Sequence, residues 1–285
     1  MNVDVMTGYE VRIANARKIF TDADFVIIGA GAGLSDAAGL KYNGKRFSDN
    51  FGQFIAKYKF TDLYTSSFYP FETEEERWAY WAKHISINRY DIGATQLYLD
   101  LHRLVKDKEY FVITTNVEGQ FAKAGFDKQK IFAVQGDYAY FQCAKACHPK
   151  LYYNEELVDA MIKQTNDCKI PSDLVPHCPV CGGPMDVNLR KDSYFVEDEN
   201  WKTAIANYQF FIGRAKEGKT VLIELGVGFN TPGIIKYPFE EMVFKFPSFS
   251  LIRLNSLHPD GYPINEKRTI SFIEEMDMVI KDLDS

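Results

Sequence analysis

Short apolar runs recur along the chain, and most of them end in polar or glycine-containing turns. The runs are DFVIIGAGAGL, EYFVIT, KIFAV, TVLIEL and FSLIRL. Periodic apolar positions predict helices that flank or separate these runs, over 5–21, 94–106, 201–215 and 269–283. Continuous apolar strands that alternate with helices are typical of a parallel sheet covered on both faces. The pattern therefore predicts an α/β protein with a parallel sheet.

Two regions interrupt this alternation. Residues 41–93 are rich in Tyr, Phe and Trp and predict a helical insertion. Residues 138–195 contain all five cysteines, several prolines and no long periodic segment. We interpret the two regions together as a second, smaller lobe. The larger domain then comprises residues 1–40, 94–137 and 196–285.

Composition and charge narrow the class of protein. The chain has 285 residues, of which 46% are hydrophobic and 25% charged, as in ordinary globular proteins. The formal net charge of −6 disfavours a nucleic-acid partner, because phosphate binding needs a basic face. The N-terminal sequence lacks a signal-peptide pattern, and no apolar run reaches the length of a membrane span. We expect a cytoplasmic protein with reduced cysteines and no nucleic-acid or membrane partner.

The polar segments that follow the apolar runs form the candidate site, because ligands bind beyond the carboxyl ends of parallel strands. Gly29, Gly31 and Gly33 suit a backbone that approaches a phosphate closely, although a tight strand-to-helix turn also explains them. The usual dinucleotide fingerprint has a third glycine where this chain has Leu34, and its acidic ribose-binding residue is missing. An ordinary dehydrogenase is therefore disfavoured.

A second polar segment, TTNVEGQF, places Asn116, Glu118 and Gln120 directly after a predicted strand. Side chains at this position contact ligands in parallel sheets, whereas the alternative is a helix cap formed by Thr115 or Asn116. Further candidates at strand ends or in the predicted small lobe are Gln135, Arg190, Gly226, Gly228, Asn230 and Asn255.

Four of the cysteines form two closely spaced pairs, Cys143 with Cys147 and Cys178 with Cys181. Two such pairs are typical of a tetrahedral, structural zinc site, which would stabilise a lobe with little periodic core. Zinc rather than another soft metal is inferred from the four sulfurs. His148 and His177 flank the pairs and are alternative ligands, and four unrelated thiols are the other interpretation. Cys168 is assigned no role.

The order of these motifs resembles the sirtuin family. GAGLSDAAGL, TTNVEGQF, VQGD, the two cysteine pairs, LGVGFN and LN follow one another over nearly the whole chain. The resemblance implies a Rossmann-like domain and a smaller lobe made of a zinc module and a helical insertion, with NAD bound between the two. The residues that it implies for NAD binding are Gly31, Ala32, Gly33, Asp36, Leu40, Asn116, Glu118, Gln135, Gly226, Gly228, Asn230 and Asn255. Tyr69 and Arg190 are added from their aromatic or charged character.

The chain departs from the usual family pattern at informative positions. Gln135 stands where the family has a histidine base, Glu118 replaces an aspartate, and Lys41-Tyr42-Asn43-Gly44 replaces Pro-Asp-Phe-Arg. In these features the chain is similar to the macrodomain-linked class of microbial sirtuins, which transfer ADP-ribose to proteins. The resemblance implies a lipoyl-carrying acceptor, similar to the glycine-cleavage H protein, and a macrodomain protein that reverses the modification.

The chemistry of glutamine favours transfer over deacylation. Glutamine has no accessible pKa, and loss of a general base lowers a rate by about 10² to 10⁴. Nicotinamide departs as a neutral molecule, and an ionised carboxylate acceptor needs no deprotonation, so positioning and charge stabilisation are enough. We predict an NAD-dependent ADP-ribosyltransferase with Asn116 and Gln135 as catalytic residues. The alternatives are a weak NAD-dependent deacylase and a non-catalytic NAD or ADP-ribose sensor.

Overall fold

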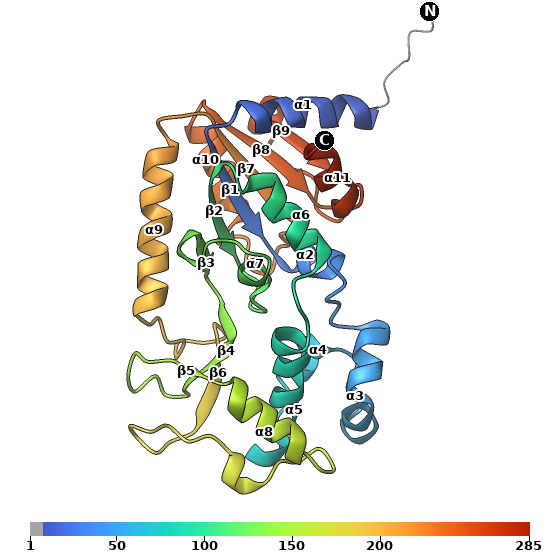
Figure 1. Cartoon of the computed structure of the whole chain (residues 1–285), viewed down its shortest axis with the longest axis vertical. Coiled ribbons are helices and arrows are strands. Elements are labelled where there is room, and N and C mark those ends of the chain that lie inside the picture. Colours follow the sequence, from blue (N-terminus) through green and yellow to red (C-terminus); the bar gives the residue numbers. More distant parts are fainter. Residues whose placement is uncertain (1–7) are drawn as a thin grey trace, which may run out of the picture.

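A six-stranded parallel sheet forms the centre of the larger lobe in the computed structural model, which describes residues 8–285 (Figure 1). Its order is β3-β2-β1-β7-β8-β9, and every neighbouring pair is parallel. The strands are β1 (Phe25–Ala30), β2 (Glu109–Thr114), β3 (Ile131–Ala133), β7 (Thr220–Leu225), β8 (Phe249–Leu254) and β9 (Thr269–Phe272). Each predicted apolar run contains one of these strands, and the predicted fold class is confirmed.

Helices cover both faces of the sheet because successive strand side chains point in opposite directions. Val26 and Ile28 of β1 pack in one apolar cluster, whereas Ile27 packs in another. The first cluster includes side chains of α1 (Gly8–Asp22), α2 (Ala32–Ala37), α6 (Gln96–Val105), α7 (Gln120–Lys123) and α11 (Met276–Leu283). The second includes side chains of α9 (Glu199–Ala215) and α10 (Lys236–Lys245).

The predicted helices are confirmed with one correction. Helices α1, α6 and α9 match the predictions, and the start of the first prediction, over 5–7, lies outside the described residues. The prediction of a helix over 269–283 is wrong at its start, because Thr269–Phe272 forms the edge strand β9 and the helix begins at Met276. Among residues 8–285, no helix is both long enough and apolar enough for a membrane crossing.

The smaller lobe lies below the sheet in the view of Figure 1. Residues 41–93 form the predicted helices, namely α3 (Gly44–Tyr58), α4 (Leu63–Ser66), α5 (Glu74–Ile85) and the π-helix η1 (Ser86–Tyr90). Residues 138–195 hold more regular structure than the sequence indicates, with α8 (Glu155–Gln164) and most of an antiparallel sheet. Its strands are β4 (Gly136–Cys143), β5 (Tyr152–Tyr153) and β6 (Met185–Leu189). The two regions share one apolar cluster, although the boundaries of the lobes stay a prediction.

The remaining short elements are 3₁₀ turns that connect these layers. They are η2 (Lys128–Lys130), η3 (Ser172–Leu174) and η4 (Pro263–Arg268). Helix α5 begins with a well-formed cap, because the Thr73 side chain accepts a hydrogen bond from the Glu76 amide at 3.3 Å. Acidic residues in its first turn also suit the positive end of the helix dipole. These features fix the start of α5, the helix that carries the buried side chains of Tyr80 and His84.

A buried group of four charges ties α10 to the sheet. Glu224 of β7 lies beside Arg253 of β8, and their side chains form two hydrogen bonds of 2.9 Å. Lys236 donates to Glu224 at 2.8 Å, and Arg253 donates to Glu240 at 2.8 Å. All four residues are almost fully buried, and their charges sum to zero. The group therefore anchors the loops that leave the carboxyl ends of both strands.

Removing one charge from this group is expected to destabilise the fold. Lys236→Met leaves an uncompensated buried carboxylate, which costs about 3–5 kcal/mol. Lys245→Met is the matched control on the same helix, because Lys245 pairs with Glu241 on the surface and such pairs contribute about 0.3–0.5 kcal/mol. Urea unfolding of both variants measures the difference. Equal losses would contradict the role of the buried group.

Candidate functional site

The turn after β1 packs directly on the turn after β7. The Gly31 amide donates to the Leu225 carbonyl at 2.9 Å, and the Gly33 amide donates to the Gly226 carbonyl at 3.0 Å. A Cβ atom on Gly33 would lie 2.8 Å from the Cα of Gly226, whose φ of 59° also favours glycine. Both predicted glycine segments are thus brought together. The close approach of the two backbones explains why glycine occupies these positions, and a bound ligand is not needed for that explanation.

Asn116 and Glu118 lie in the loop after β2, beside this glycine turn. The Asn116 side-chain nitrogen donates to the Gly31 carbonyl at 3.0 Å, which fixes the orientation of its amide. Glu118 is buried, and its Oε1 accepts hydrogen bonds from Ser35 at 2.7 Å and from the Tyr98 hydroxyl at 3.1 Å. Burial and the nearby Glu118 raise the pKa of Tyr98 well above its usual value, so Tyr98 stays protonated. Side-chain donors from two separate helices, α2 and α6, therefore hold the carboxyl group of Glu118.

Gln135 occupies the turn between β3 and β4, as predicted. Its backbone carbonyl accepts a hydrogen bond from the Arg190 amide at 3.0 Å, and Gly136 beside it has a φ of 102°. Its side-chain Oε1 is buried, yet none of the residues that the structure describes donates a hydrogen bond to it. A buried acceptor without a partner costs free energy, so this atom is a candidate for a contact with a ligand donor.

The two segments share one pocket of about 380 Å³. Asn116 and Glu118 line it from the loop after β2, and Gly136 and Asp137 line it from the turn after Gln135. The other lining residues are Thr114, Val117, Gly119, Gln120, Phe121, Ala122, Ile131 and Ala133. Arg89 of η1 closes this region through a salt bridge of 2.8 Å to Asp137. The polar ends of β2 and β3 therefore meet, as the sheet topology requires.

The remaining predicted residues lie at varied positions around these turns. Ala32, Asp36, Gly228 and Asn230 are exposed, and Leu40 is buried. Asn255 is also buried, and it links the two loops at the ends of β7 and β8 by donating to the Val227 carbonyl at 2.9 Å. All of these roles in NAD binding stay predictions.

Tyr69 and Arg190, the two residues proposed from character alone, are already engaged with protein. The Tyr69 ring lies 5.0 Å from the rings of both Phe60 and Phe71, in an aromatic cluster of the small lobe. The Arg190 guanidinium donates to Glu197 at 2.6 Å and lies 4.2 Å from the ring centre of Phe195. Of the two, only Arg190 is directly bonded to the Gln135 turn, through its backbone.

Ser35 and Tyr98 are functional candidates that the sequence analysis did not identify. Ser35 lies within the motif GAGLSDAAGL, in which the sequence predicts its neighbour Asp36 as a binding residue. Tyr98 lies in a helix whose periodic leucines indicate only core packing. The polar character of Ser35 beside the glycines was the available signal, whereas Tyr98 had none.

A chain of buried hydrogen bonds runs through the small lobe to this site. His84 of α5 is fully buried, with its Nδ1 3.1 Å from the Tyr80 hydroxyl and its Nε2 2.9 Å from the Tyr138 hydroxyl. The Tyr138 hydroxyl in turn lies 2.9 Å from the hydroxyl of Tyr42. Burial, followed by the charge of Arg46, lowers the pKa of His84 to about 3. This imidazole is therefore neutral at physiological pH.

No imidazole takes the position of a base beside Gln135 in residues 8–285, which include all five histidines. His84 bonds two tyrosines, as described above, and His102 packs on Phe126. His148 and His177 lie in the zinc module, and His258 contacts Phe229 edge-to-face, with the ring centres 4.9 Å apart. The substitution of the base by Gln135 is thus not compensated by a histidine from another element.

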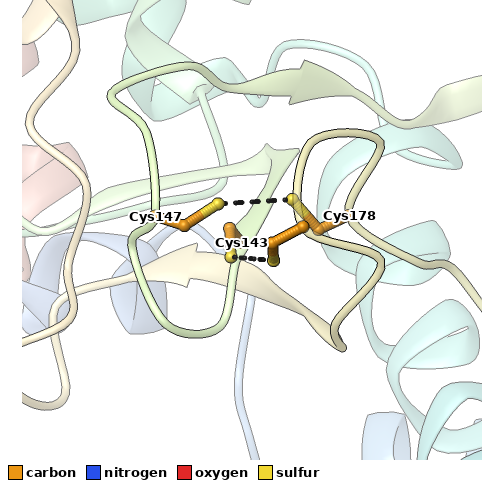
Figure 2. Close-up of side chains that lie close together, drawn as sticks. Cys143, Cys147 and Cys178 are labelled. Carbon is orange, nitrogen blue, oxygen red and sulfur yellow. Dashed lines mark hydrogen bonds between the residues drawn. The ribbon is translucent and has the colours of Figure 1, made fainter.

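Four cysteine sulfurs converge at the far end of β4 (Figure 2). The Sγ atoms of Cys143 and Cys181 are 3.7 Å apart, those of Cys147 and Cys178 are 3.6 Å apart, and all four lie within 4.8 Å of one another. Zinc bound at about 2.3 Å in a tetrahedron separates its sulfurs by about 3.8 Å, so the arrangement fits a closed structural zinc site. His148 Nδ1 lies 3.0 Å from the Cys147 sulfur, which suits a group that supports a ligand.

Sequence comparison relates the chain to protein ADP-ribosyltransferases, although no protein-family model matches it. A protein ADP-ribosyltransferase of Staphylococcus aureus (strain Mu50) is 35% identical over 268 residues, covering 93% of this chain and 84% of the relative. A probable bifunctional ADP-ribose hydrolase/ADP-ribosyltransferase of Fusarium oxysporum f. sp. cubense is 32% identical over 241 residues. That match covers 81% of this chain and 40% of the longer relative.

Comparison with solved structures shows the fold. A Sir2 homologue in complex with NAD superposes with a TM-score of 0.58 at 14% identity, covering 95% of this chain and 92% of the other. A mutant Sir2 homologue in complex with ADP-ribose gives 0.58 at 13% identity, covering 95% and 94%. A Sir2 protein bound to a propionylated peptide gives 0.57 at 16% identity, covering 94% and 95%. The chain therefore has the Sir2 fold over almost its whole length.

The buried His84 predicts a pH dependence of stability. The unfolded state binds the imidazole proton below about pH 6.5, whereas the folded state binds it only near pH 3, so stability falls as the pH drops through this window. At pH 5 the loss from His84 is about 2 kcal/mol relative to pH 7.5. His84→Gln cannot titrate, so urea unfolding should show a smaller loss by that amount. Identical pH profiles would contradict the neutral, buried imidazole.

The cysteine cluster predicts one bound zinc per chain. Cys178→Ala should lose the metal and destabilise the small lobe, because structural zinc contributes directly to folding. Cys168→Ala is the matched control, since Cys168 is equally buried but lies outside the cluster. Metal analysis of the purified variants, with thermal unfolding before and after chelation, measures both effects. Zinc retained by Cys178→Ala would contradict a closed four-thiolate site.

Proposed function

The chain belongs to the sirtuin family of protein ADP-ribosyltransferases, and we propose that it modifies an acidic side chain of a lipoyl-carrying protein similar to the glycine-cleavage H protein. In the proposed reaction NAD is the donor, and nicotinamide is released. The main support is Gln135, which places a buried, unpaired acceptor where the wider family has a basic histidine. A site without the histidine base suits an acceptor that is already ionised.

The bond changes in this reaction need no base. The bond between C1′ of the ribose and the pyridinium nitrogen breaks, and its electron pair leaves with nicotinamide, which becomes neutral. A carboxylate oxygen of the acceptor then forms a bond to C1′. No proton moves in either step, so the protein has only to position both partners and stabilise the positive charge that develops on the ribose.

The proposed roles follow from the hydrogen-bonding capacity that remains on each side chain. Glu118 is a buried carboxylate whose Oε2 accepts one hydrogen bond, from the Val117 amide at 3.1 Å, and has capacity for the carboxamide of nicotinamide. Asn116 uses its nitrogen on the Gly31 carbonyl, so its oxygen is available to accept from a ribose hydroxyl. We assign the unpaired Oε1 of Gln135 the same kind of contact.

The acceptor and the reversal of the modification are the more specific parts of the proposal. The Fusarium relative joins an ADP-ribose hydrolase and a transferase in one protein, by its name, which supports a modification that is removed as well as added. We propose that a separate macrodomain protein performs the removal for this chain. The carrier protein itself is proposed from the resemblance to macrodomain-linked sirtuins.

Intact-mass spectrometry tests this proposal. The enzyme is incubated with NAD and an H-protein-like carrier, lipoylated or bare, while a parallel reaction contains an acetyl-lysine peptide. We expect one ADP-ribose adduct on the carrier, cleaved by neutral hydroxylamine as an ester on a carboxylate is, and no change in the peptide. The bare carrier shows whether the lipoyl group is required. A deacylated peptide without a carrier adduct would contradict the proposal.

Variants of two glutamines connect the adduct to the site. Gln135→Ala should lower kcat/KM for transfer by about fivefold, since a lost hydrogen bond is worth about 1 kcal/mol. Gln53→Ala is the control, because Gln53 is exposed on α3. Equal rates for both variants would remove Gln135 from the proposed reaction.

A further inference from the structure

The buried chain of Tyr42, Tyr138, His84 and Tyr80 has no part in the reaction derived above. It joins α5 and β4 to the segment after α2 through contacts of 3.1, 2.9 and 2.9 Å. The surrounding core is made of aromatic and aliphatic side chains, among them Trp81 at 5.0 Å from the His84 ring. Apolar residues of similar size would fill this space without the cost of burying polar groups. The polar chain therefore needs an explanation other than packing.

The outer end of the chain is anchored to the elements that hold Glu118. The Tyr138 amide donates to the Val117 carbonyl at 2.9 Å, directly beside Glu118. The Leu40 amide donates to the Ser35 carbonyl at 2.8 Å, two residues before Tyr42, and the Ser35 hydroxyl bonds Glu118. Burial, followed by repulsion from Glu118, raises the pKa of Tyr42 to about 12. Tyr42 is therefore a protonated phenol, and the charge of Glu118 acts on its hydroxyl group.

The direction of the hydrogen bonds along the chain follows from the number of protons available. Tyr80 donates its single proton to the Leu63 carbonyl at 3.0 Å, so it accepts from His84 Nδ1. A neutral imidazole that donates at Nδ1 accepts at Nε2, and Tyr138 is the donor there. Tyr138 then accepts from Tyr42. In this arrangement the phenol oxygen of Tyr42 keeps free lone pairs, which have the capacity to accept a hydrogen bond from a further donor.

We propose that Tyr42 is a further NAD-binding side chain, which accepts a hydrogen bond from the nicotinamide half of the bound dinucleotide, and that Tyr138, His84 and Tyr80 position it. This inference deepens the proposed function and rests on it. The donor is a ribose hydroxyl or the carboxamide nitrogen, which are the donors of that half. Helix α5 of the small lobe would then determine, through His84 and Tyr138, that the Tyr42 oxygen is free to accept a hydrogen bond from NAD.

Steady-state kinetics of nicotinamide release with Tyr42→Phe and Tyr138→Phe tests the inference. Each variant should raise KM for NAD about threefold to tenfold with little change in kcat, because the contact acts alike in the ground state and the transition state. The double variant should match Tyr42→Phe alone, since both changes remove one contact. Loss of folded protein alone would lower kcat and leave KM unchanged. Unchanged KM in both variants, or additive effects in the double variant, would overturn the inference.

Two further variants separate positioning from simple packing. His84→Gln retains an amide that can bond Tyr138 and should keep KM near that of the native protein, whereas His84→Leu should raise it as Tyr138→Phe does. Tyr208→Phe is the control for loss of a buried hydroxyl, because Tyr208 packs against Phe111 and Phe132 in the larger lobe. If Tyr138→Phe does not fold, Tyr42→Phe and the His84 pair decide the question.

Direct binding distinguishes failure of this inference from failure of the proposed function. Calorimetric titration with NAD and with ADP-ribose compares native protein and Tyr42→Phe without any need for an acceptor. Weaker binding of both ligands assigns Tyr42 to the ribose, and weaker binding of NAD alone assigns it to the carboxamide. Unchanged affinity for NAD overturns the inference even where transfer to the carrier is observed. Absence of transfer together with weaker NAD binding overturns the proposed acceptor and leaves the role of Tyr42 standing.

Discussion

A buried carboxyl group beside the glycine turn is the constraint on which the site depends. Glu118 loses its contact with water on folding, so the protein has to supply hydrogen-bond donors in its place. Ser35 of α2 and Tyr98 of α6 supply two of them, so both helices must reach the carboxyl end of the sheet. The close packing of the glycines in the turns after β1 and β7 brings the start of α2 to the carboxyl end of the sheet, where Ser35 reaches Glu118. The backbone geometry of these turns therefore determines how Glu118 is held.

The zinc module and the Gln135 turn are the two ends of one hairpin. Strand β4 runs over eight residues from Gly136 to Cys143, about 27 Å in an extended strand, and pairs with β6 at both ends. A metal that fixes Cys143 would also fix the register of the adjoining pairs, Phe141 with Val187 and Gln142 with Asp186, whereas the register shifts between Phe141 and Gly136. A structural zinc would therefore support the hairpin whose opposite end adjoins Gln135.

The sequence indicated the sheet well because apolar runs and the polar turns after them are local patterns. The clustering of the four cysteines was predicted for the same reason, and so were the positions of Asn116, Glu118 and Gln135 in turns after strands, whereas the roles of these three side chains stay predictions. It missed β9, since Thr269–Phe272 is a short strand directly before an amphipathic helix. It also missed the chain through His84, which sits in an aromatic helix where nothing local distinguishes a hydrogen-bonded imidazole from a packed one. Contacts between residues far apart in sequence decide such features, and no periodicity encodes them.

The absence of a histidine base beside Gln135, in the part of the chain that the structure describes, has a consequence for the choice of acceptor in the proposed reaction. A lysine acceptor is protonated at neutral pH and has no lone pair until a base removes its proton, and a serine hydroxyl is a weak nucleophile for the same reason. Aspartate and glutamate are ionised already. His84 shows that the fold holds an imidazole only about two side chains from the site, but burial keeps it neutral and both of its nitrogens are engaged. In the proposed reaction, a site of this kind would select its acceptor by the acceptor's own pKa, so that replacing one histidine by glutamine would change the reaction that the fold supports.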